Sequence, residues 1–152
     1  MYDDILVPTD GSDEAATALG QAFDLARTYD ATVHVLYVVD DSRGDSGLMG
    51  LADGDPLASV REEGRDAVEA IARRARDADV TVTTAVRQNL PHEGIREYAD
   101  EHDVDLIVMS SRGRSGVSRV LFGSVTERVL RLSERPVLVV SRTTPPDDGE
   151  SD

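Results

Sequence analysis

The residues of this chain best suited to bind an anion lie between positions 106 and 132. The apolar run at 106–109 predicts a buried strand, and the segment 110–116 after it consists of serine, arginine and glycine. A strand, a glycine-containing loop and a helix start form an anion cradle, because backbone N–H groups and the positive end of the helix dipole converge there. A plain tight turn is the alternative interpretation of the glycines. The helix start is indicated by Gly123 and Ser124, directly before apolar residues in helical spacing at Val125, Val129, Leu130 and Leu132.

This segment matches neither of two common phosphate-binding motifs. A Walker A loop needs a lysine before its last serine or threonine, and the chain has no lysine. The dinucleotide fingerprint needs Gly-x-Gly-x-x-Gly, and the glycines at 113, 116 and 123 do not fit that spacing. The segment therefore belongs to neither of these two classes of phosphate-binding motif.

Length and composition favour a single intracellular domain. A chain of 152 residues is long enough for one sheet with helices on both faces. Cysteine is absent, which excludes disulfides, thiol catalysis and cysteine-ligated metals. No apolar run approaches the roughly twenty residues of a transmembrane helix, and the start lacks the basic and then apolar pattern of a signal peptide. We expect a cytoplasmic protein with no membrane partner.

The charge is strongly negative. The net charge at pH 7 is −14, and all 16 basic residues are arginine. Because this field repels nucleic acid, we exclude nucleic acid as a partner. A surface rich in aspartate and devoid of lysine is typical of proteins adapted to multimolar salt, and we interpret the chain as halophilic. An ordinary acidic protein is the alternative.

Five strand candidates alternate with helical segments. Most are continuous apolar or β-branched runs, typical of strands covered on both faces, at 5–7, 32–39, 80–86, 106–109 and 137–140. Helices are predicted at 12–26, with Ser12 as N-cap, and at 56–78, 91–102 and 125–132. This alternation predicts an α/β fold: a single Rossmann-like domain with an open parallel five-stranded sheet and helices on both faces. Ligands of such sheets bind beyond the carboxyl ends of the strands.

Two segments are expected to be irregular. Residues 40–55 contain four glycines and predict a flexible loop at the ligand edge of the sheet. Residues 143–152 contain two prolines and several acids, and they predict a disordered acidic tail. The folded domain is therefore expected to span residues 1–142.

Four pieces of the chain resemble the universal stress protein family, in its ATP-binding branch. Residues 5–12, Ile-Leu-Val-Pro-Thr-Asp-Gly-Ser, resemble that family's first strand and turn, and residues 90–93 resemble the entry to its third helix. Gly113, nine further residues and then Gly123-Ser124 resemble the second half of its Gly-x2-Gly-x9-Gly-Ser/Thr signature. Residues 136–140 resemble its closing strand. The likeness extends to about residue 142, and with it we expect the strand order 3-2-1-4-5.

The resemblance implies an ATP site at the ends of the first, second and fourth strands, with Mg²⁺ as a possible companion of the phosphates. It places Pro8, Thr9 and Asp10 near the base and ribose, and the backbone of Val38 against the adenine. It implies that the phosphates are wrapped by the loop at 110–116 and held at the following helix start. The residues implied for the phosphates are Ser110, Arg112, Gly113, Arg114, Gly116, Gly123, Ser124, Val125 and Thr126.

Several of these assignments have alternatives. Ser110 replaces the first glycine of the signature and adds a β-carbon where the backbone approaches the ligand. Asp10 could bond a ribose, cap the following helix, or do both. Arg112 and Arg114 could neutralise phosphate charge or balance nearby acids as a solvated pair. Ser124 is expected to cap its helix in either case.

No catalytic residue and no metal site is predicted. His34, His92 and His102 lie on different elements without metal-ligand spacing, and His34 is expected to be a satisfied core or interface residue. The leading hypothesis is a cytoplasmic ATP-binding stress or signalling module that forms a homodimer through the edge of its fifth strand. The alternatives are a slow Mg²⁺-dependent ATPase and an ATP-free stress protein that acts through protein contacts.

Overall fold

Five parallel strands form one sheet in the order β3-β2-β1-β4-β5, which confirms the predicted fold class and strand order. The computed structural model describes residues 2–41, 57–111 and 123–141. The tail predicted at 143–152 and the loop predicted at 40–55, beyond residue 41, lie outside these ranges. The strands are β1 (Asp4–Thr9), β2 (Thr32–Asp40), β3 (Thr81–Asn89), β4 (Leu106–Ser110) and β5 (Val137–Val140).

The central strands of the sheet are buried on both faces. β1 pairs with β2 from Asp4↔Thr32 to Thr9↔Tyr37, and β4 pairs with the other edge of β1. Consecutive residues of a strand point to opposite faces, yet all three residues at 5–7 have no exposed surface. Burial on both sides is the reason that the strands appear in the sequence as continuous apolar runs.

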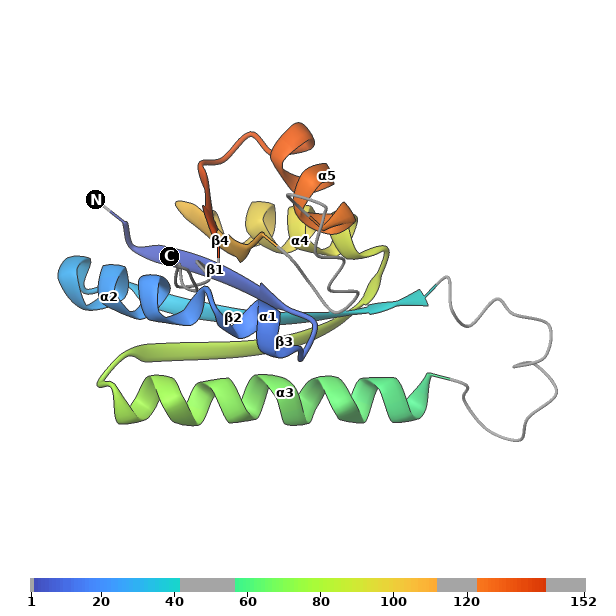
Figure 1. The fold of residues 1–152 in the computed structure, drawn as a ribbon, viewed down its shortest axis with the longest axis horizontal. Coiled ribbons are helices and arrows are strands. Elements are labelled where there is room, and N and C mark those ends of the chain that lie inside the picture. Colours follow the sequence, from blue (N-terminus) through green and yellow to red (C-terminus); the bar gives the residue numbers. More distant parts are fainter. Residues whose placement is uncertain (1, 42–56, 112–122, 142–152) are drawn as a thin grey trace, which may run out of the picture.

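Helices cover both faces of this sheet (Figure 1). One face carries α2 and α3, and the other carries α4 and α5. No helix within the described ranges is both long and apolar enough to cross a membrane. The helices are α1 (Asp13–Ala16), α2 (Leu19–Tyr29), α3 (Ala58–Asp77), α4 (Pro91–Glu101) and α5 (Ser124–Leu132).

The segment predicted as one helix at 12–26 is two helices, α1 and α2, and this corrects the sequence interpretation. The backbone N–H of Ala18 donates to the carbonyl of Ala15, three residues back, at 3.5 Å, which interrupts the α-helical ladder. The β-branched side chain of Thr17, a type restricted at χ1, stands at the break. Helix α1 contacts β1 and β4.

Helices α2, α3 and α4 end in the same way. The aspartates at 30, 79 and 103 have φ values of 57°, 60° and 50°, in the left-handed region. The N–H of the next residue donates to the carbonyl five residues back, which is the Schellman arrangement. These turns lead the chain from each helix into the following strand. The bonds are Ala31 to Ala26 (2.9 Å), Val80 to Ala75 (2.8 Å) and Val104 to Ala99 (3.0 Å).

Candidate functional site

A cleft of about 270 Å³ lies at the carboxyl ends of β1, β2 and β4. The strand order reverses between β1 and β4, and open α/β sheets bind their ligands at this point. All the predicted site residues that the structure describes line this cleft. The lining residues are Pro8, Thr9, Asp10, Ala15, Leu36, Val38, Pro91, Ile95, Met109, Ser110, Gly123, Ser124, Val125 and Thr126.

A tight turn at 9–12 forms the β1 side of the cleft. The N–H of Gly11 donates to Oγ1 of Thr9 at 3.0 Å, and its φ of 83° is a conformation that glycine adopts without strain. One carboxylate oxygen of Asp10 accepts hydrogen bonds from the N–H (2.9 Å) and the hydroxyl of Ser12. Oγ of Ser12 accepts in turn from the N–H of Ala15 at 3.1 Å. Ser12 is therefore the N-cap of α1, as predicted, and Asp10 braces that cap while it lines the cleft.

The end of β4 and the start of α5 are joined by two hydrogen bonds. The N–H of Gly123 donates to the carbonyl of Ser111 at 2.6 Å. The hydroxyl of Thr126 donates to the carbonyl of Ser110 at 2.9 Å, and both side chains are buried. The N–H of Ser111 also donates to the carbonyl of Val140 on β5, at 3.0 Å. These hydrogen bonds, all between residues that the structure describes, hold the start of α5 against the sheet.

Helix α5 begins at the cleft without a side-chain cap. Its N-cap is Gly123, in extended conformation with φ −67° and ψ 162°. The helix ladder starts at this residue, because the N–H of Glu127 donates to its carbonyl at 2.9 Å. Ser124, predicted as the cap, is instead the first helical residue, so that prediction was wrong by one position. The N–H groups of a first helical turn have no acceptor within their helix, so this end presents donors and positive potential to the cleft.

An apolar wall completes the cleft, and its residues, with the exception of Val38, were not predicted from the sequence. Leu36 and Val38 share one face of β2 as alternate residues, and Pro91 and Ile95 share one face of α4 as residues four apart. These spacings, two residues on a strand and four on a helix, are visible in the sequence, so each pair could have been predicted to share a face. Nothing in the sequence states that α4 covers this end of β2. The residues missed are Ala15, Leu36, Pro91, Ile95 and Met109.

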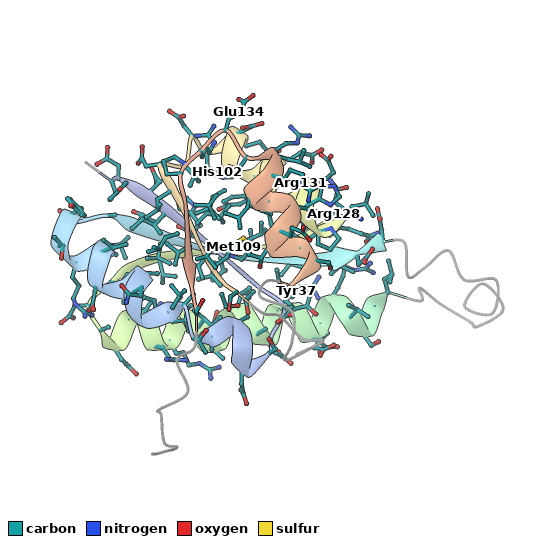
Figure 2. The ribbon with its side chains drawn as sticks, turned by 45° about the horizontal axis from the view of Figure 1, so that its top comes forward. Tyr37, His102, Met109, Arg128, Arg131 and Glu134 are labelled. Carbon is teal, nitrogen blue, oxygen red and sulfur yellow. The ribbon has the colours of Figure 1, made fainter. Side chains whose placement is uncertain are left out.

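Formal charge is sparse in the described part of the cleft, where Asp10 is the one charged lining residue. The predicted phosphate residues Arg112, Gly113, Arg114 and Gly116 lie outside the described residues. Arg131 extends from the outer side of α5 (Figure 2) and pairs with Glu127 at 3.0 Å. Within the described ranges, an anion in the cleft therefore meets backbone N–H groups instead of side-chain cations. No group of three or more His, Cys, Asp or Glu residues suited to a metal occurs in those ranges.

His34, Tyr98 and His102 form a cluster that is separate from the cleft. His34 is buried near the amino end of β2, and its Nε2 lies 2.8 Å from a carboxylate oxygen of Asp4. Its Nδ1 lies 2.8 Å from the hydroxyl of Tyr98, so it is a satisfied core residue, as predicted. Burial raises the pKa of Tyr98 above the ordinary value of 10.0, and the protonated hydroxyl can donate to Nδ1. His102 stacks on the Tyr98 ring with the ring centres 3.9 Å apart.

The sheet order, the covering helices and the cleft at the switch point define a doubly wound α/β protein. The chain belongs to the universal stress protein family, whose profile matches residues 1–141. It is 38% identical over 146 residues to universal stress protein MJ0531 of Methanocaldococcus jannaschii, covering 93% of this chain and 84% of that relative. The solved structure of protein MJ0577 superimposes with a TM-score of 0.84 at 33% identity, covering 95% of this chain and 99% of that chain.

Two similar solved structures hold adenine nucleotides. A universal stress protein in complex with cAMP is 26% identical with a TM-score of 0.65, covering 92% of this chain and 97% of that chain. The universal stress protein from Archaeoglobus fulgidus in complex with dAMP is also 26% identical, with a TM-score of 0.63 and coverage of 91% and 97%. Members of this family with the same fold therefore bind adenine nucleotides.

Proposed function

We propose that this protein binds an adenine nucleotide, ATP, in the cleft at the ends of β1, β2 and β4. The observation that carries the proposal is that one cavity combines an apolar wall with an uncapped helix start. An apolar wall suits a base, and a helix N-terminus suits phosphates. The cAMP and dAMP complexes of related proteins support the same class of ligand.

In this proposal each side of the cleft contacts a different part of the nucleotide. The base lies against Val38 on β2 and Ile95 on α4, and Asp10 lies beside the ribose. The phosphates extend toward Ser110 and the start of α5. The segment 112–116 supplies Arg112 and Arg114 for charge neutralisation, its glycines allow close approach of the backbone, and Mg²⁺ accompanies the phosphates.

We propose a binding module without chemistry of its own, acting in stress response or signalling in the cytoplasm of a salt-adapted cell. The chain has no lysine that could reach the phosphates. A slow Mg²⁺-dependent ATPase is the enzyme alternative, and it predicts release of inorganic phosphate from ATP at a rate proportional to protein concentration. The binding module predicts no release above the rate without protein.

Titration calorimetry tests the nucleotide site directly. Folded protein freed of nucleotide would be titrated with Mg-ATP in multimolar KCl, and saturable heat is expected below millimolar ATP. A Ser110→Gly variant should bind at least as tightly, because the change removes a β-carbon from the cleft. Absence of heat at millimolar ATP, in protein that circular dichroism shows to be folded, would leave the ATP-free alternative.

We also propose a homodimer through the open edge of β5. This strand is the last in the sheet order and pairs with β4 on one side. All four of its residues, Val-Leu-Val-Val, are partly exposed, and an apolar edge strand favours pairing with a second chain. Light scattering in multimolar KCl should give twice the chain mass of 16.4 kDa. A monomer at micromolar concentration would contradict the dimer.

A further inference from the structure

We infer that the hydroxyl of Thr126 is a positioning group for the phosphate end of the cleft and not a ligand of the phosphates. The inference rests on the proposed nucleotide site and refines it. Thr126 lies in the first turn of α5 and is only 5% exposed. Its Oγ1 donates at 2.9 Å to the carbonyl of Ser110, at the end of β4. The hydroxyl hydrogen is therefore directed at the strand end, where it fixes the helix.

The peptide group between Ser110 and Ser111 is held at both of its polar atoms. Its carbonyl oxygen accepts from Thr126, and its N–H donates to the carbonyl of Val140 on β5 at 3.0 Å. Hydrogen bonds in series through one peptide group polarise and strengthen one another. The bond from the N–H of Gly123 to the carbonyl of Ser111, at 2.6 Å, adds a second tie between the same segments. The start of α5 is thus fixed to β4 and, through β4, to β5.

Loss of the Thr126 hydroxyl should affect phosphates and spare the base. The N–H groups proposed for the phosphates move with α5, and hydrogen bonds weaken steeply as distance and angle depart from the optimum. The proposed base wall belongs to other elements, with Val38 on β2 and Pro91 and Ile95 on α4. A displaced helix start would therefore lower the affinity for ATP more than the affinity for adenosine.

Three variants separate positioning from general packing. Thr126→Val keeps the shape of the side chain and removes the hydroxyl, whereas Thr126→Ser keeps the hydroxyl. Ser133→Ala is the matched control, because it removes a hydroxyl at the other end of α5, where Oγ of Ser133 bonds the backbone of Arg135 at 3.0 Å. Each variant and the parent would be titrated with Mg-ATP and with adenosine in the same KCl buffer, and thermal melts would verify folding.

The expected result is a change in the ratio of the two affinities. Thr126→Val should weaken ATP binding about tenfold, in keeping with the loss of one buried hydrogen bond, and should change adenosine binding less than about twofold. Thr126→Ser and Ser133→Ala should stay within about twofold of the parent for both ligands. If Thr126→Val does not fold, Thr126→Ala, which also lacks the hydroxyl, is expected to give the same ratio.

Three results would overturn the inference. Equal losses for ATP and adenosine in Thr126→Val would mean that the hydroxyl acts on packing alone, and an unchanged ATP affinity would mean that it does not position the phosphate donors. A Thr126→Ser variant as weak as Thr126→Val would show that retaining the hydroxyl is not sufficient for phosphate affinity, because serine keeps that group and lacks only the methyl. If the parent protein binds neither ligand, the proposed nucleotide site itself is wrong. If the parent binds ATP but the variants keep the parent's ratio of ATP affinity to adenosine affinity, only the inference about Thr126 is wrong.

Discussion

Replacing Gly123 with aspartate should stabilise the fold and abolish nucleotide binding in one step. Gly123 is the N-cap of α5, and its φ of −67° and ψ of 162° are open to any L-residue. Aspartate is among the best N-cap residues, because its carboxylate accepts hydrogen bonds from the N–H groups of the first turn. These N–H groups are the donors that the proposed site offers to the phosphates. The same substitution therefore has opposite effects on stability and on affinity.

The size of each effect follows from the position at the helix start. A capping side chain in place of glycine contributes a few tenths of a kcal/mol, and a carboxylate at the positive end of a helix adds about 0.3–1 kcal/mol at low salt. We expect the free energy of unfolding to rise by about 0.5–1 kcal/mol, with the smaller value in high salt. A carboxylate about 4 Å from a phosphate repels it by roughly 4 kcal/mol at an effective dielectric constant of 20. The affinity for ATP should therefore fall more than about 100-fold.

Denaturant unfolding and calorimetry in one KCl buffer would measure both effects. Gly123→Ala adds a β-carbon without a cap or a charge, and it reports the steric cost of that atom alone. Gly123→Asn caps the helix without a charge, so it separates occupation of the donors from repulsion. If folded Gly123→Asp protein binds ATP within about threefold of the parent affinity, the start of α5 is not the phosphate site. If Gly123→Asp unfolds more easily than Gly123→Ala, the cap argument is wrong.

Three further predictions concern the fold. Burial raises the pKa of Tyr98 above 10.0, so the contribution of this residue to stability is complete below pH 10 and is lost as the pH rises through the folded-state pKa. The free energy of unfolding in urea should therefore decline between roughly pH 8 and 11, and Tyr98→Phe should reduce that decline. Asp79→Gly should raise the free energy of unfolding by about 0.5–1 kcal/mol, because its φ of 60° suits glycine and a carboxylate opposes the negative end of α3, and an unchanged denaturation midpoint would contradict this. The melting temperature should rise steeply with KCl, because the screening length falls from about 10 Å at 0.1 M to about 3 Å at 1 M, and equal stability at low salt would contradict the halophilic interpretation.

The sequence was sufficient for the sheet because strand burial leaves a local pattern. Continuous apolar runs and their alternation with helices identified all five strands, and the contiguous motif at 123–126 supplied four of the residues that line the cleft. The break between α1 and α2 was missed because Ala15 to Ala18 keeps a helical apolar pattern across it. Ile95 was missed as a lining residue for a different reason. The spacing that places Ile95 on the apolar face of α4 is visible in the sequence. The packing of α4 over the end of β2 depends on tertiary contacts, which the sequence pattern does not predict.

Because this chain has no lysine, the positive potential that a polyanionic ligand would require must come from other groups. The net charge is −14, and Asp10 adds a carboxylate to the described part of the cleft. The N–H groups at the start of α5 supply partial positive charge that does not titrate, but its effect falls off within the first turn. The exact placement of that turn therefore matters more here than in a site with flexible lysines. Two hydrogen bonds set this placement, from Thr126 and from Gly123 to the end of β4. For this reason we expect a hydroxyl and a glycine, both uncharged, to control phosphate affinity at the described end of the cleft.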